Sequence, residues 1–176
     1  MGIVSKLVSI HNRFLSLEKQ ALKAGVKLGA NNFIASKFWS TEPYLISIGS
    51  HCQITSGVHL HTHGGGNSVR SIIPTFDCFG KVTIGDYVYL GTNVQVMPGV
   101  TIGNNVLVAA GSIVTKSIPS NVVVGGNPAR IICTIEEYIA NNAKYNLNSK
   151  GMNPKEKEKL LKSRKRPISR LDGRLI

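Results

Sequence analysis

The sequence has few aromatic residues and no long apolar run. Phe, Trp and Tyr make up 6% of the 176 residues, while hydrophobic residues as a whole make up 42%. No apolar stretch is long enough to cross a bilayer, and residues 1–14 lack the uninterrupted apolar centre of a secretory signal. These absences predict a core filled with aliphatic side chains, in a protein that stays in the cytoplasm.

Cysteine and acidic residues are also scarce. The three cysteines, Cys52, Cys78 and Cys133, are odd in number and widely spaced. This pattern predicts neither a disulfide framework nor a paired cysteine metal site, and it fits a reducing compartment. Nine acidic residues are outnumbered by 21 Lys and Arg, ten of which lie in residues 150–176. That basic tail has no aromatic residue to stack on a base, so no nucleic-acid partner is expected.

What the sequence does contain is an aliphatic repeat of six residues over 82–119. A period of six fits neither an amphipathic helix nor a strand with alternating faces. It is typical of stacked coils in which each hexapeptide forms a short strand and a turn. The first aliphatic series is Ile84, Leu90, Val96, Ile102, Val108 and Val114, and a second series four residues later is Val88, Val94, Val100, Val106, Ser112 and Ile118.

The same register extends the repeat towards the N-terminus. It begins at Leu28, is interrupted by an irregular stretch at 37–47, and resumes at Ile48. Cys52 falls at an inward position and is interpreted as a small core residue. Residues 64–80 contain no hexapeptide and are expected to form an excursion loop, which is often a functional feature. The expected fold class is an all-β solenoid, with a β-sandwich of short strands as the alternative.

The pattern divides the chain into three regions. Residues 1–24 are expected to be a helical cap, because the apolar residues of 3–24 fall near one side of a helix and the open end of a solenoid needs covering. Residues 25–133 form the solenoid, and residues 134–176 form a C-terminal helix with a basic extension. The basic residues of the N-terminal helix leave peripheral association with a membrane surface open.

Three histidines, His59, His61 and His63, alternate with Leu60 and Thr62 directly before the excursion loop. In an extended strand, alternate side chains point to the same side. Surface histidines are the simpler interpretation, but three of the chain's five histidines lie in this one segment. Their position beside a long loop favours a functional role.

Several sequence strings resemble the bacterial hexapeptide-repeat acyltransferases, most closely those that acetylate capsule, O-antigen and exopolysaccharide sugars. They are EPYLISIG, ITSGVHLHTHGGG, FGKVTIGD, MPGVTIG, AAGSIVTKSIPSN and GGNPARII, from about residue 25 to residue 138. The resemblance implies a left-handed parallel β-helix, a homotrimer, and acetyl-coenzyme A as donor for O-acetylation of a sugar or polysaccharide precursor. His63 matches the family's catalytic histidine and would act as general base. Gly64 stands where members usually have an acidic residue.

The resemblance also implies where the substrates bind. The acceptor is expected against residues 37–47 and 64–80, with His61, Tyr44 and Arg70 as candidate contacts. Neither a covalent nucleophile nor a metal is expected. The coenzyme is expected in a groove between two solenoids, along the later coils. Its candidate contacts are Ala109, Ala110, Gly111, Ser112, Thr115, Lys116 and Arg130.

Other functions known for this solenoid leave alternatives open. Relatives acetylate serine, streptogramin or phenicol antibiotics, or amino sugars, and the irregular segments do not identify the acceptor. A trimeric zinc carbonic anhydrase takes its histidines from separated coils, whereas this chain has no histidine after His63. Because Gly64 departs from the family pattern, a glycan-binding solenoid without catalysis is the non-enzyme alternative.

Overall fold

The computed structural model describes residues 15–163. The chain divides after Ile135 into two units, and each is described by itself. Among the described residues, all strands lie in the first unit.

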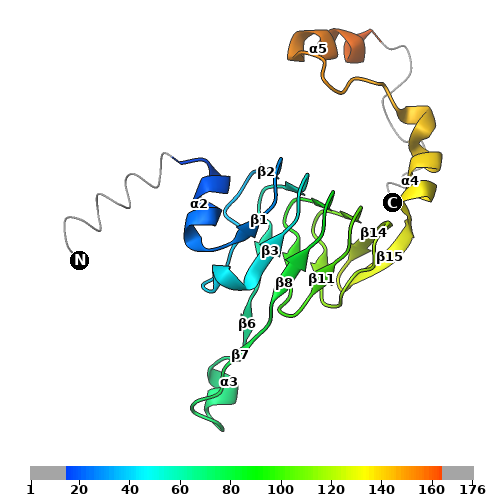
Figure 1. Ribbon diagram of the computed structural model, residues 1–176. Helices are drawn as coiled ribbons and strands as arrows, with labels where there is room; N and C mark the ends of the chain where they lie inside the picture. Colours follow the sequence, from blue (N-terminus) through cyan, green and yellow to red (C-terminus); the bar gives the residue numbers. More distant parts are fainter. Residues whose placement is uncertain (1–14, 164–176) are drawn as a thin grey trace. The chain divides into compact units, whose positions relative to one another are not determined.

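Three mainly parallel sheets, which the chain visits in turn, make up the first unit (Figure 1). The first sheet has the order β1-β3-β8-β11, formed by Lys27–Leu28, Ile46–Ile48, Val82–Ile84 and Thr101–Ile102. The second has the order β2-β4-β9-β12-β14-β15, formed by Phe33–Ile34, Gln53–Ile54, Tyr89–Leu90, Leu107–Val108, Val122–Gly126 and the antiparallel Ala129–Thr134. The third has the order β5-β10-β13, formed by His59–Leu60, Gln95–Val96 and Ile113–Val114. We call one passage through the three sheets a coil.

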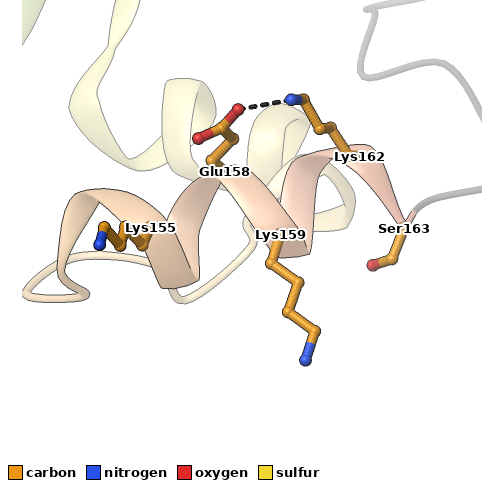
Figure 2. Close-up of a pocket in the computed structure, with 5 residues that line it drawn as sticks. All are labelled: Lys155, Glu158, Lys159, Lys162 and Ser163. Atoms are coloured by element: carbon orange, nitrogen blue, oxygen red, sulfur yellow. Dashed lines mark hydrogen bonds and ion pairs between the residues drawn. The ribbon is translucent and has the colours of Figure 1, made fainter.

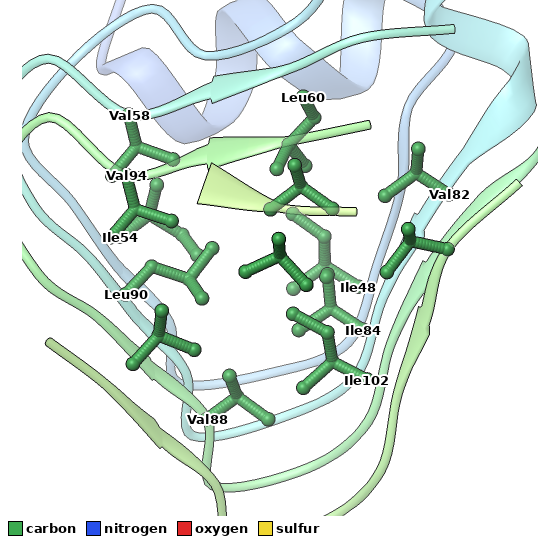
Figure 3. Packing of buried hydrophobic residues seen from close by; sticks show 14 of the residues in the cluster. Ile48, Ile54, Val58, Leu60, Val82, Ile84, Val88, Leu90, Val94 and Ile102 are labelled. Carbon is green, nitrogen blue, oxygen red and sulfur yellow. The ribbon is translucent and has the colours of Figure 1, made fainter. Parts of the chain in front are cut away.

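Neighbouring strands pair at a spacing of three hexapeptides, as the repeat predicts. Ile84 pairs with Ile102, and Leu90 pairs with Val108. Every residue of the first aliphatic series is at most 2% exposed. Figure 3 shows Ile48, Ile84 and Ile102 beside one another on the inner side of the sheets. Parallel pairing rules out a β-sandwich, whose sheets are antiparallel.

Tight corners separate the short strands. Asn93 and Asn105 have φ angles of 60° and 53°, in the left-handed region that asparagine tolerates better than most residues. Successive coils also approach closely at their corners. A Cβ atom on Gly85 would lie 2.8 Å from the carbonyl carbon of Gly103, so a side chain there would force the two coils apart.

The first coil departs from the hexapeptide pattern. Its third side is a bridge from Trp39 to Leu60, one residue earlier than a full hexapeptide after Ile34. Phe38 beside the bridge is fully buried, so a large ring fills the core of this coil. The first part of stretch 37–47, expected as an interruption, therefore completes the first coil.

A helix lies against the first coil. α2 (Leu17–Ala24) contacts β2 and the short 3₁₀ helix η1 (Pro43–Leu45). Ser16 caps its start, and Gly25 ends it with a φ of 107°. The prediction of one continuous helix over 3–24 is wrong, because Ser16 is an N-cap and the helix begins at Leu17. The earlier part of that range lies outside the described residues.

The excursion loop 64–80 is a hairpin that extends away from the sheets in Figure 1. β6 (His63–Gly64) pairs antiparallel with β7 (Cys78–Phe79), and α3 (Asn67–Arg70) lies near the tip. Ile48 pairs with Ile84 across the insertion, so the coil register continues past the loop.

The second unit is helical. α4 (Ile135–Asn142) begins at the boundary, η2 (Ala143–Tyr145) follows, and α5 (Pro154–Lys162) places Lys155, Lys159 and Lys162 around a surface hollow (Figure 2). Lys162 forms an ion pair with Glu158 there. The rest of the basic tail, 164–176, lies outside the described residues. No helix within residues 15–163 is long and apolar enough to span a bilayer.

Candidate active site

His63 lies where the chain leaves the third sheet and enters the hairpin. It is the first residue of β6 and pairs with Phe79 of β7. The base of the hairpin is closed by Gly80, whose N–H donates to the carbonyl oxygen of Thr62 at 2.8 Å. The two strands therefore fix the backbone that carries the imidazole, while the side chain of His63 stays 47% exposed.

The imidazole of His63 contacts a carboxylate from a distant part of the sequence. Nδ1 of His63 lies 2.9 Å from Oε2 of Glu42, the residue that precedes η1. Thr62 donates its hydroxyl to the same oxygen at 2.6 Å, and Thr41 donates to Oε1 at 2.6 Å. Each carboxylate oxygen of Glu42 thus accepts a short hydrogen bond from a threonine.

These hydrogen bonds determine the charge of Glu42. Those from Thr41, Thr62 and His63 lower the pKa of Glu42 from 4.5 to about 2. Glu42 is therefore ionised at neutral pH. Because an ionised carboxylate only accepts hydrogen bonds, Nδ1 of His63 is the donor in this contact.

Gly64 leaves room that a neighbouring sulfur partly fills. A Cβ atom on Gly64 would lie 3.1 Å from Sγ of Cys78 on the paired strand. A larger side chain at position 64 would require Cys78 to move. Position 64 therefore offers no carboxylate to His63 and faces a cysteine on the paired strand.

His59 and His61 have different contacts from His63. Their rings are 6.3 Å apart, and Nε2 of His61 lies 2.7 Å from Oε1 of Gln95 on β10. Simple alternation along one extended segment predicts three imidazoles on the same side. The corner after β5 instead directs His63 towards Glu42.

The other two candidate acceptor residues, Tyr44 and Arg70, lie on η1 and on α3 near the loop tip. Tyr44 is 65% exposed on η1. Arg70 is engaged within the loop, since its Nε donates to the carbonyl oxygen of Phe76 at 3.0 Å and its Nη2 lies 3.5 Å from Asp77. Arg70 therefore helps to hold the shape of the loop tip.

Most candidate coenzyme residues are exposed on the last complete coil and the following hairpin. Ser112 is the exception. It is fully buried, its hydroxyl donates to the carbonyl oxygen of Ala109 at 2.7 Å, and it accepts from the N–H of Gly126 at 3.1 Å. Ser112 thus holds the corner on which its neighbours lie. The exposed members are Ala110, Gly111, Thr115, Lys116 and Arg130, and Ala109 is half-buried.

Comparison with known proteins identifies the family. Residues 81–116 match the family described as bacterial transferase hexapeptide (six repeats). Protein CapG of Staphylococcus aureus is 46% identical over 158 residues, covering 82% of this chain and 90% of CapG. The chain belongs to the hexapeptide-repeat transferases.

Named hexapeptide-repeat transferases and solved structures agree with this assignment. The putative colanic acid biosynthesis acetyltransferase WcaF of Escherichia coli is 36% identical, covering 61% of this chain and 69% of WcaF. A maltose O-acetyltransferase from Clostridium difficile superposes with a TM-score of 0.56 at 32% identity, over 62% of this chain and 59% of that chain. The acetyltransferase VCA0836 from Vibrio cholerae shares the fold with a TM-score of 0.61 at 24% identity, over 74% and 88% of the two chains. The prediction of an acyltransferase of this family is confirmed.

Glu42 is the site residue that sequence reasoning missed in this hexapeptide-repeat transferase. It lies 21 positions before His63, in the irregular stretch, so no periodicity connects the two. The sequence left Glu42 as one of three candidate carboxylates. Residues 25–133 contain three carboxylates, and the other two, Asp77 and Asp86, accept from the backbone N–H groups of Cys78 and Ser50.

Proposed function

We propose that this enzyme transfers the acetyl group of acetyl-coenzyme A to a hydroxyl of a sugar or polysaccharide precursor, with His63 as general base. One observation carries the proposal: the half-exposed imidazole of His63 is held through Nδ1 by Glu42 at 2.9 Å. This leaves Nε2 available beside the loop that adjoins the acceptor residues. Relatives named for colanic acid, galactoside and maltose acetylation support a sugar acceptor.

The proposed reaction requires one proton carrier. Nε2 of His63 takes the proton of the acceptor hydroxyl while its oxygen attacks the thioester carbonyl carbon. The tetrahedral intermediate then expels the coenzyme thiolate as the carbon–sulfur bond breaks, and the imidazolium returns the proton to sulfur. A positioned general base contributes about two to four orders of magnitude to such a reaction.

The three sheets are proposed to be the faces of a left-handed parallel β-helix spanning 25–133. We assign α2 to capping and residues 134–176 to an accessory extension. The coenzyme is proposed to lie along the exposed residues from Ala110 to Lys116, where small side chains permit close approach to the backbone. Lys116 and Arg130 have exposed cationic ends suited to its phosphates.

A homotrimer follows from this arrangement, because one copy provides a single wall for the coenzyme. Sedimentation of the purified protein is expected to give three chains per particle. A stable and active monomer would contradict the shared donor site.

Release of coenzyme A tests the function, measured across sugars, nucleotide sugars, oligosaccharides, serine and amino sugars. His63→Ala is expected to lower turnover by at least about a hundredfold, while acetyl-coenzyme A binding is largely retained. His59→Ala is the matched control, because it removes an exposed imidazole from the preceding strand. Tyr44, His61 and Arg70 are proposed to affect the acceptor KM.

The outcome of this assay decides between the proposals. Normal turnover in His63→Ala with loss in His61→Ala would move the base to His61. Release with serine or an amino sugar, and none with glycan precursors, would replace the proposed acceptor class.

A further inference from the structure

We propose that Glu42 is a positioning residue that keeps His63 in the tautomer protonated at Nδ1. This inference rests on the proposed role of His63 as general base. It assigns the function of a residue outside the hexapeptide repeat.

All the hydrogen-bonding groups around Nδ1 of His63 present lone pairs to it. Oε2 of Glu42 lies at 2.9 Å and belongs to an ionised carboxylate. The hydroxyl oxygen of Thr41 lies at 3.3 Å, but its single proton is already donated to Oε1 of Glu42 at 2.6 Å. Thr62 uses its proton on Oε2 in the same way. With acceptors on this side, the imidazole carries its proton on Nδ1, and Nε2 is the basic nitrogen.

Each of the two carboxylate oxygens of Glu42 accepts a hydrogen bond from a threonine. Thr62 is fully buried at the base of the hairpin, and Thr41 lies next to Glu42 in the chain. Two donors on two different oxygens oppose rotation of the carboxylate. The side chain of Glu42 is 16% exposed, compared with 47% for His63. Glu42 is therefore less exposed to solvent than the imidazole that it contacts.

No other carboxylate in residues 25–133 is available for this role. Asp77 lies near Arg70 in the loop and accepts from the N–H of Cys78 at 3.1 Å. Asp86 accepts from the N–H of Ser50 at 2.6 Å. Position 64, next to His63, is a glycine, and a Cβ atom there would lie 3.1 Å from the sulfur of Cys78. The site therefore takes its carboxylate from the segment before η1.

Glu42→Gln tests the inference, with Glu42→Asp as the conservative variant. The two threonines donate to different oxygens of Glu42, and the amide has an oxygen at only one of these two positions. When its NH₂ takes the other position, it can donate to Nδ1 and favour the wrong tautomer. We expect kcat to fall by about a hundredfold or more, as for carboxylate-to-amide changes beside a histidine base. The KM for acetyl-coenzyme A should change less than about threefold. Glu42→Asp should retain more activity than Glu42→Gln. Glu18→Gln, on α2, is the matched control and should behave as wild type.

Nitrogen-15 NMR of histidine-labelled protein reads the tautomer directly. In the wild type, the His63 ring should show a protonated Nδ1 and an unprotonated Nε2, and Glu42→Gln should shift the population towards a protonated Nε2. The His63→Ala spectrum assigns the signals. A merely structural role for Glu42 would not alter this ratio.

The outcomes separate the inference from the function on which it rests. Wild-type kcat and an unchanged tautomer in Glu42→Gln, together with an inactive His63→Ala, would overturn the inference and leave the function intact. An active His63→Ala would overturn the function first. If Glu42→Gln does not fold, the wild-type spectrum still decides, because a neutral His63 ring that is protonated at Nε2 contradicts the proposal.

Discussion

Thr62 and Ser112 are the two fully buried polar residues among the buried side chains of the described chain, and their hydrogen bonds differ in kind. The hydroxyl of Ser112 connects two backbone groups, the carbonyl of Ala109 and the N–H of Gly126. The hydroxyl of Thr62 donates to a side chain, Glu42, which in turn holds an exposed imidazole. A buried hydroxyl that contacts only backbone stabilises a corner. One that begins a chain of side chains leading to solvent orients a reactive group.

Thr62→Val should give the largest effect in this comparison. Valine has nearly the shape of threonine but cannot donate to Glu42, so the carboxylate becomes free to rotate. We expect kcat to fall about tenfold, the factor that corresponds to about 1.4 kcal/mol, with little change in the melting temperature. Thr62→Ser keeps the donor and should restore most of the activity. A large loss of stability with an unchanged kcat would show that Thr62, like Ser112, stabilises the fold and does not orient the imidazole.

Ser112→Ala should show the opposite pattern. Removing the hydroxyl takes the acceptor from the Gly126 N–H and leaves the Ala109 carbonyl with the backbone N–H of residue 112 at 3.3 Å. The loss costs about 1 kcal/mol of unfolding free energy. Denaturant unfolding at fixed protein concentration measures this change. At saturating acetyl-coenzyme A, kcat should fall less than in Thr62→Val. A variant as stable as wild type would show that water replaces the hydroxyl at this corner.

The smallest expected effect is the pH dependence of stability that comes from Glu42. Its pKa is about 2 in the folded protein, compared with an ordinary value of 4.5. Ionised Glu42 therefore stabilises the folded state above pH 4.5, and this contribution is lost as the pH falls towards about 2. The stability difference between wild type and Glu42→Gln should shrink over that window. A difference that stays constant down to pH 2 would contradict the assigned pKa.

The sequence predicted the coils because their core depends on a local pattern. Every inward residue from Ile84 to Val114 in the first series is buried, and Cys52 is 1% exposed, as its register indicates. The first coil was harder to predict because Phe38 and Trp39 complete it one residue out of register. The large ring of Phe38 fills the core of this coil, although the bridge at Trp39 lies one residue before the position that the six-residue repeat predicts.

The candidate site was only half predictable. His63 was accessible to sequence reasoning because it lies at the junction of repeat and loop. Glu42 was not, because hydrogen bonds between distant segments leave no periodic trace. Its contact with His63 depends on how the segment before η1 folds back towards the hairpin, and on the direction in which the corner turns the ring. Neither is fixed by strand alternation.

The close approach of Gly85 and Gly103 fixes the spacing between successive coils. Because the backbones of successive coils approach closely at this corner, the coils are stacked at a constant distance. Neighbouring strands are about 4.8 Å apart. His63 leaves the coil that contains β5, whereas Gly111 lies two coils further on, in the coil that contains β13. Inserting or removing one coil of three hexapeptides between these two corners would change their separation by one strand spacing. If the acceptor lies at His63 and the coenzyme at Gly111, as proposed, their separation along the stack changes in steps of that size.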